Sequence, residues 1–185
     1  MNKERTTIEE FRLTGDEAIL EEYQLRDSGD CKYPYDQNYN RRKDLIFELY
    51  KDCTAQDRLL LKWLIKQELS GFEAELPVWT TDIAAFLLFK HMEMTDVYDL
   101  YDAKFGAGTD HQCTVDIEFI FGPGREEMKN FLQKENSERS KEILTAIEWY
   151  EKNPNAKFRS KEEYIEYFES RKFNTLCADL EDSEY

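Results

Sequence analysis

The chain has 185 residues, of which 25 are Lys or Arg and 40 are Asp or Glu, so its formal net charge at pH 7 is -15. With 41% hydrophobic and 14% aromatic residues, the composition excludes a disordered acidic tail and predicts one folded domain over residues 1–185, with no need of a metal or disulfide. The charge disfavours binding to nucleic acid and to anionic membranes, which attract Lys and Arg, and makes a basic protein the complementary partner.

Apolar residues recur at helical spacing along almost the whole chain, whereas alternating β-branched runs are nearly absent, which predicts an all-α fold. The first helix is expected from about Ile8 to Tyr23, with a kink or break at Gly15. Residues 26–40 hold several Asp and Asn residues together with glycine and proline, so we expect an irregular connection there. That connection carries three tyrosines, Tyr33, Tyr35 and Tyr39.

A tight turn separates the next two predicted helices. The first spans Arg41 to Cys53, and the second begins at Thr54, where Asp57 at the third helical position gives a capping-box pattern. Leucines and Trp63 make this second helix the expected centre of the core. It ends near Ser70-Gly71, because glycine readily adopts the left-handed cap conformation.

An unusually apolar helix is expected from Thr81 to His91. Apolar residues cover most of its circumference, so it should be buried on more than one side. Its most apolar stretch, Ile83 to Phe89, is far shorter than the roughly 20 residues that cross a bilayer, and no transmembrane segment is expected. The same stretch leaves open a purely structural subunit in which this helix is buried in an oligomer.

Glycine-rich turns end the following helices. Thr95 is expected to cap a helix from Asp96 to Phe105, which Gly106-Ala107-Gly108 ends. A short apolar helix from Thr114 to Phe121 closes at Gly122-Pro123-Gly124. Neither glycine turn follows a strand or precedes the Lys-Ser/Thr of a phosphate-binding loop, so both are interpreted as helix punctuation. The remaining predicted helices are Arg125 to Gln133, Ser137 to Lys152 and Ser160 to Phe173, followed by an acidic, frayed tail over 174–185.

The order of these elements indicates how they pack. Consecutive antiparallel helices with short joints predict helical hairpins stacked as a short α-solenoid, or an irregular helical bundle. The last helix opens with Ser160-Lys161-Glu162-Glu163, a second capping-box pattern. The four cysteines are widely scattered and no apolar signal segment follows Met1, so we expect free thiols in a cytoplasmic protein.

One block of the sequence resembles a known kind of protein. Asp96 to Lys104, followed by Cys113 to Gly124, is similar to a pattern in uncharacterised bacterial helical-repeat proteins of HEAT-like type, over roughly a fifth of the chain. In those proteins an aromatic-acid-Ala-Lys helix end, a Cys-x-x-Asp-apolar helix and a Gly-x-Gly turn are packing signatures, so the resemblance implies a fold and no catalytic residue. Small acidic helical-repeat proteins also look like some immunity proteins of bacterial toxin systems, which implies a protein partner.

The segment from Glu93 to Glu118 holds seven acidic residues and a single lysine. On a helix from Asp96 to Phe105, Asp96, Asp99 and Asp102 fall on one arc and are expected to face solvent together. One interpretation is a solvated helix face whose acids favour the helix N-terminus through its dipole. The other is a docking surface for a basic protein. Three exposed carboxylates lack the oxygen cage of a calcium loop, so no metal or other cofactor is expected.

The leading functional hypothesis is a non-enzymatic protein-interaction module that binds a basic protein, as an immunity protein or an adaptor does. In this hypothesis Asp96, Asp99 and Asp102 steer the partner and set its orientation. Aromatic residues in or beside loops contribute most of the affinity, and the candidates are Tyr33, Tyr35, Tyr39 and Trp79.

The alternative hypothesis is an enzyme whose carboxylate, Cys and His groups meet only in three dimensions. Asp110-His111-Gln112-Cys113 is expected in a glycine-bounded loop, where functional residues often sit. The spacing of these residues matches no zinc or nucleophile motif, so no catalytic residue is assigned. The sequence leaves open whether Asp110, His111 and Cys113 meet other polar groups, which helix face is concave, which partner binds, and the oligomeric state.

Overall fold

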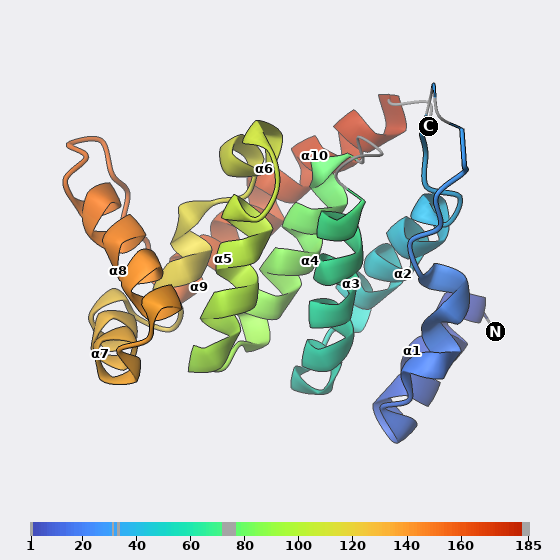
Figure 1. The fold of residues 1–185 in the computed structure, drawn as a ribbon, viewed down its shortest axis with the longest axis horizontal. Helices are drawn as coiled ribbons and strands as arrows, with labels where there is room; N and C mark the ends of the chain where they lie inside the picture. The colour runs from blue at the N-terminus through green and yellow to red at the C-terminus, as the bar shows by residue number, and fades with distance from the viewer. Residues whose placement is uncertain (1, 31, 33, 72–76, 183–185) are drawn as a thin grey trace.

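A computed structural model describes residues 2–30, 32, 34–71 and 77–182. Within these residues the protein is all-α, with ten α-helices and no strand, as the apolar periodicity predicts (Figure 1). No helix in the described part is long and apolar enough to cross a membrane. The α-helices are α1 (Lys3–Thr14), α2 (Tyr39–Asp52), α3 (Arg58–Ser70), α4 (Val78–His91), α5 (Val97–Phe105), α6 (Thr109–Thr114), α7 (Arg125–Glu135), α8 (Glu138–Glu151), α9 (Lys161–Tyr167) and α10 (Phe173–Asp182). The 3-10 helices are η1 (Glu17–Tyr23), η2 (Ala55–Asp57), η4 (Met94–Asp96) and η5 (Ile117–Phe121), and η6 (Phe168–Lys172) is a π-helical turn.

The helices pack as adjacent pairs, which confirms the predicted stack of hairpins. α1 packs on α2, α3 on α4, α5 on η5 and α7 on α8. Neighbouring pairs meet through α2 with α4 and through α3 with α5. Figure 1 therefore shows a row of pairs, from α1 and α2 at one end to α7 and α8 at the other. Buried apolar side chains from all the pairs form one continuous core.

Two of the joints between pairs are built in the same way. The segments 54–57 and 93–96 each form a 3-10 turn that leads directly into the next helix. In each turn the last carboxylate accepts a hydrogen bond from the first backbone N–H: Thr54 donates to Asp57 at 2.7 Å, and Glu93 donates to Asp96 at 2.8 Å. The capping box predicted at Thr54 is confirmed, whereas the turn before α5 starts at Glu93 rather than at Thr95.

α4 lies at the centre of the molecule. Each residue from Thr80 to Phe89 is at most 2% exposed, because α2, α3, α5, α6, η5 and α10 all pack against this helix. The predicted burial on more than one side is confirmed. Helices of the same chain cover the apolar stretch from Ile83 to Phe89, so it no longer supports a subunit that is buried in an oligomer.

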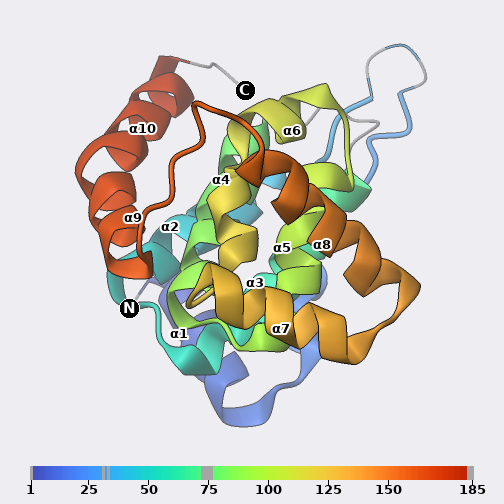
Figure 2. The ribbon, with the colours of Figure 1, turned by 90° about the vertical axis from the view of Figure 1, so that its left-hand side faces the viewer.

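The C-terminal segment, residues 161–182, comprises α9, η6 and α10 and runs as a nearly continuous helix across α2 and α4 (Figure 2). Phe168 stacks on Phe86 with ring centroids 3.8 Å apart, and Phe173 stacks on Tyr50 at 3.7 Å. The sequence predicted a helix end at Phe173 and a frayed tail over 174–185. The helix instead continues to Asp182, because the body of the protein supplies a packing surface for it. Residues 183–185 lie outside the described part.

The N-terminal helix differs from the prediction at its start and agrees at its break. It begins at Lys3 because the Asn2 side chain accepts a hydrogen bond from the Glu4 backbone N–H at 3.0 Å and caps the helix. It ends at Thr14, where Gly15 has φ 63°. This left-handed conformation favours glycine and confirms the predicted break.

Candidate functional site

The predicted acidic face of α5 is not a solvent-facing row of three carboxylates. Asp96 is fully buried. Both of its oxygens accept hydrogen bonds from Arg58, at 2.7 Å and 3.0 Å, and Lys62 Nζ lies 2.5 Å from Oδ1. Burial alone would raise the pKa of Asp96, but hydrogen bonds from Arg58 and Lys62 outweigh it and hold the pKa below its usual value. The prediction that Asp96 faces a partner is therefore corrected: this carboxylate joins α5 to α3.

The same arrangement occurs one pair earlier. Arg12 of α1 donates to both oxygens of the fully buried Asp57, at 2.7 Å and 2.8 Å. Arg12 thus holds the carboxylate at the end of η2, and Arg58 holds the carboxylate at the end of η4, which fixes α1 against η2 and α3 against η4. A guanidinium that donates to both oxygens of a carboxylate fixes the relative orientation of the two groups. Asp57 and Asp96 therefore hold helices together and have no role at the surface.

Asp99 and Asp102 remain at the surface. Their side chains are 35% and 44% exposed. Asp99 lies 3.1 Å from Lys62 Nζ, and Asp102 forms an ion pair with Arg139 of α8. Arg139 also lies over the ring of Tyr101, with 4.7 Å between the guanidinium carbon and the ring centroid. Two of the three predicted carboxylates are therefore accessible, although each has a cation beside it.

The predicted aromatic contact residues that the structure describes differ in their exposure to solvent. Tyr35 lies in the irregular connection and is 58% exposed, as expected for a contact residue. Tyr39 begins α2 and is only 5% exposed, because the connection ends at Asn38 rather than at residue 40. Trp79 is half-buried in the first turn of α4 and packs against the core. Tyr33 lies outside the described residues.

The segment from Asp110 to Cys113 is helical, in α6, rather than a loop. His111 is buried, with Nε2 3.4 Å from the hydroxyl of Thr81, and burial lowers its pKa. Cys113 and Asp110 are exposed on the same short helix. No group of three or more His, Cys, Asp or Glu side chains in the described part is arranged to hold a metal ion. The predicted helix from Thr114 to Phe121 is thus divided between α6 and η5.

A long hollow of about 810 Å³, the α3 groove, runs along α3 between α1 with η1 and the start of α5. Leu59 in this groove is 66% exposed, and Trp63, one helical turn further, is half-buried. Asp99 and Asp102 lie at the α5 edge. The residues that define the α3 groove here are Phe11, Glu17, Leu59, Trp63, Asp99 and Asp102.

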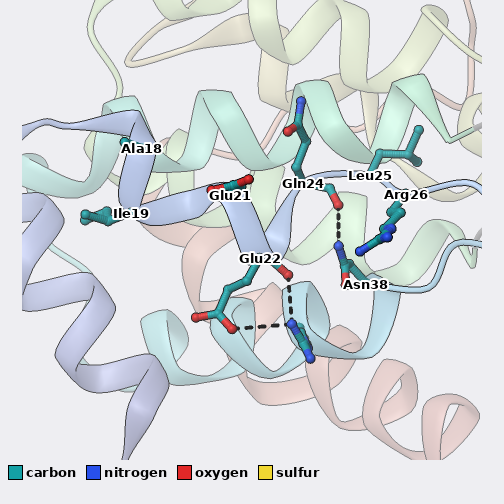
Figure 3. A pocket seen from close by; sticks show the side chains of 9 residues that line it. Ala18, Ile19, Glu21, Glu22, Gln24, Leu25, Arg26 and Asn38 are labelled. Carbon is teal, nitrogen blue, oxygen red and sulfur yellow. Dashed lines mark hydrogen bonds and ion pairs between the residues drawn. The ribbon is translucent and has the colours of Figure 1, made fainter.

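A second hollow, of about 670 Å³, lies between η1 and the start of α2 (Figure 3). Asn38 donates to the backbone carbonyl of Gln24 at 2.8 Å (Figure 3), and Arg41 donates to the carboxylate of Glu22 at 3.3 Å. Several of its polar groups therefore bind one another. These contacts hold η1 on α2, and we assign this hollow a structural role.

Four polar side chains meet beneath the C-terminal segment. Lys172 of η6 donates to Asp82 of α4 and to Asp116 before η5, each at 3.0 Å, and the hydroxyl of Tyr164 donates to Asp116. Asp82 is fully buried, and burial raises its pKa to about 7 although Lys172 opposes the shift. Burial lowers the pKa of Lys172, but the charges of Asp82 and Asp116 outweigh it and leave that pKa raised. We call Asp82, Asp116, Tyr164 and Lys172 the buried polar cluster.

Sequence reasoning missed this cluster, although one signal was present. Asp82 is the single charged residue between Val78 and Phe89, a stretch whose other residues are mostly apolar. A charge in such a helix needs a partner from elsewhere in the fold. That partner is 90 residues away, in a segment predicted only as the end of a helix.

Comparisons of the chain with protein-family models, with curated proteins and with solved structures give no match. The functional assignment therefore depends on the geometry of the α3 groove and of the buried polar cluster.

Proposed function

We propose that this protein is a non-enzymatic protein-interaction module that binds a basic protein partner through the α3 groove. The observation that carries the proposal is an exposed Leu59 in the same long hollow as Trp63 and two accessible carboxylates. A single exposed leucine needs no explanation, but apolar side chains gathered in a hollow with a polar rim are typical of an interaction site.

The exposed face of α3 matches the size of a short helical segment. Leu59, Trp63, Lys66 and Ser70 follow at intervals of four, three and four residues, so they lie along one side of the helix. From Leu59 to Ser70 the helix rises roughly 16 Å, about three turns, at 1.5 Å per residue. A partner helix of similar length could place apolar residues on Leu59 and Trp63, as in other helix-in-groove complexes.

The charges of the groove edge suit a basic partner. Three acids, Glu17, Asp99 and Asp102, line the groove edges against two lysines of α3, Lys62 and Lys66, and the whole chain carries a net -15. The present partners of Asp99 and Asp102 are side chains at the surface, where ion pairs contribute little stability and exchange readily. Lysines and arginines of the partner would replace them, while the net charge accelerates encounter.

This proposal changes the roles that the sequence suggested. Asp99 and Asp102 keep the steering role, Asp96 becomes a structural residue, and Trp63 replaces Tyr39 and Trp79 as the aromatic anchor. A cytoplasmic module of this kind would act as an immunity protein does, by covering a basic surface of its partner, or as an adaptor.

Two exposed leucines allow a matched test. Leu59→Glu places a charge inside the α3 groove, whereas Leu13→Glu changes a leucine of α1 that is 87% exposed and does not line the groove. Proteins captured at low salt from source-cell lysate are identified, purified and titrated against each variant. We expect a basic partner whose Kd rises at least tenfold, about 1.4 kcal/mol, with Leu59→Glu and changes little with Leu13→Glu. A partner that is not basic, or equal effects of the two substitutions, would contradict the proposal.

A further inference from the structure

The C-terminal segment is held on the body of the protein by aromatic stacking, by an ion pair between Lys90 of α4 and Glu169, and by the buried ammonium group of Lys172. Lys172 Nζ lies 3.0 Å from Oδ1 and 2.8 Å from Oδ2 of Asp82, 3.0 Å from Asp116 and 2.9 Å from the backbone carbonyl of Thr114. Asp82 belongs to α4, whereas Thr114 and Asp116 flank the turn between α6 and η5. Lys172 therefore joins three parts of the chain at a single point.

The π-helical turn places this lysine between the two aromatic stacks. In an α-helix, residues five apart point about 140° from one another. In η6 the N–H of Phe173 bonds to the carbonyl of Phe168, and this wider turn brings both rings to the same side as Lys172. Phe168 then reaches Phe86, and Phe173 reaches Tyr50. The π turn is thus the geometric condition for closing the segment on α2 and α4.

The carboxylate of Asp82 shares its cation with a second acid. Lys172 Nζ lies close to both oxygens of Asp82 and also donates to Asp116, so two carboxylates of the cluster have one ammonium group between them. Asp82 lies inside α4, where the backbone N–H groups are engaged in the helix and offer it none. An ionised carboxylate that is buried with so few donors raises the free energy of the closed state, and protonation removes this penalty.

We propose that protonation of Asp82 controls how tightly residues 161–182 are held on α4: the closed segment is favoured when Asp82 is neutral, and opening is favoured when Asp82 is ionised. Opening would hydrate Asp82 and Lys172 and expose the apolar surface that Phe168 and Phe173 now cover. This regulation is independent of the α3 groove, which lies along α3 with α1, η1 and α5.

The sign of the effect follows from proton linkage. In the closed state burial raises the pKa of Asp82 from 3.8 to about 7, and in the open, hydrated state it returns to the value of an ordinary aspartate. The closed state therefore binds the proton more tightly, so raising the pH from 6 to 8 shifts the equilibrium toward the open state.

The other groups around Asp82 do not reverse this direction. Lys172 from η6 has a raised pKa and stays charged. Lys104 from α5 donates to the carbonyls of Gln112 and Val115, at 2.7 Å each, and burial lowers the pKa of His111 from α6, which favours its neutral form. Burial raises the pKa of Tyr164 from α9, so this phenol stays protonated. Asp116 has Lys172 and Tyr164 as hydrogen-bond donors.

Native cysteines provide the test. Cys177 is half-buried on α10 and reports opening, while Cys113 is exposed on α6 and reports the intrinsic reaction with a thiol reagent. The labelling rate of Cys177 divided by that of Cys113 is measured by peptide mass spectrometry in the intact protein. In the wild type we expect this ratio to rise about tenfold between pH 6 and pH 8, because one pKa unit corresponds to a tenfold change in the equilibrium.

Two variants and one control complete the experiment. Asp82→Asn, a neutral isostere, should leave the ratio nearly constant over this pH range. Lys172→Met should move the rise to higher pH, because Lys172 now lowers the pKa of Asp82, and this variant tests the proposal even if Asp82→Asn does not fold. Asp110→Asn, an exposed acid on α6, should behave as the wild type. A wild-type ratio that is constant with pH, or a rise that persists in Asp82→Asn, would overturn the proposal.

Discussion

Asp96 and Asp82 are both completely buried, yet the protein shifts their pKa values in opposite directions. Asp96 ends a 3-10 turn and accepts hydrogen bonds from a backbone N–H and from both arms of Arg58. Asp82 lies inside a helix and has the ammonium group of Lys172 as its hydrogen-bond donor. Burial alone does not decide the charge of a carboxylate; the number of donors that the local backbone and the neighbouring helix supply decides it.

This difference separates two regions of the molecule. The stack of α1, α3 and α5 is joined by well-satisfied Arg–Asp pairs at its turns, and these pairs make a fixed platform for the α3 groove. The C-terminal segment is joined to α4 by the ion pair of Lys90 with Glu169 and by the buried Asp82, whose ammonium partner is shared with Asp116. Local opening can require different free energies in different parts of one fold. We therefore expect the first region to be rigid and the C-terminal segment to open more readily.

The largest expected effect comes from removing a cation of the first region. Arg58→Met takes two charge-assisted hydrogen bonds from the buried Asp96, which is left with Lys62 and the Glu93 backbone N–H as partners, and should lower the free energy of unfolding by about 3 kcal/mol. Arg139→Met is the matched control. It removes an ion pair between the half-exposed Arg139 and Asp102, and should cost less than about 1 kcal/mol. Urea unfolding of both variants at pH 7 measures the difference. Equal losses of unfolding free energy would contradict the distinction between the buried pair at the turn and the ion pair at the surface.

A second prediction uses pH to compare the two buried carboxylates. The folded-state pKa of Asp82 is raised, so its contribution to stability is fully present below about pH 4 and is lost as the pH rises to about 7. The wild type should therefore lose about 2 to 3 kcal/mol relative to Asp82→Asn over this range. The folded-state pKa of Asp96 is lowered, so its contribution is present above about pH 4 and is lost on acidification below that value.

The measurement is the free energy of unfolding of the wild type, Asp82→Asn and Asp96→Asn at several pH values between 3 and 8. The difference in free energy of unfolding between the wild type and Asp96→Asn should narrow only at the acidic end of this range. If the differences of both variants from the wild type change in the same direction with pH, the opposite pKa shifts of Asp82 and Asp96 are contradicted.

The smallest effect on stability is expected at the groove edge. Asp99→Asn and Asp102→Asn together remove surface ion pairs and should change the free energy of unfolding by less than about 1 kcal/mol. If these carboxylates steer a basic partner, the same pair of substitutions should slow association several-fold at low salt and leave it unchanged at high salt. Stopped-flow binding to the purified partner measures this, and unchanged rates at low salt would remove these residues from the proposed site.

Predictions that depended on neighbouring residues agree with the structure. The capping boxes at Thr54 and Ser160 and the break at Gly15 all involve atoms within a few residues of one another. Such features depend on backbone geometry and on the polar side chain next to it, both of which the sequence displays.

Predictions about the candidate site agreed less well. Asp96 was expected at the surface, but its partners on α3 lie up to 38 residues away in the chain. Tyr39 and Trp79 were expected in or beside loops, but Tyr39 begins α2 and is buried, and Trp79 lies in the first turn of α4 and packs against the core. Helical spacing gives the side of the helix on which a residue lies, but it does not identify the helix that packs there.

The amino-acid sequence by itself determined the helical class, most helix breaks, the apolar character of α4 and the net negative charge, because these follow from short-range periodicity, turn chemistry and composition. Only the tertiary structure decided which acids are buried and paired, that the C-terminal helix crosses α4, and that an exposed leucine and a tryptophan share the α3 groove. Those features arise from contacts between segments far apart in the chain. Whether such contacts form depends on the packing of whole helices against one another, which short-range patterns do not specify.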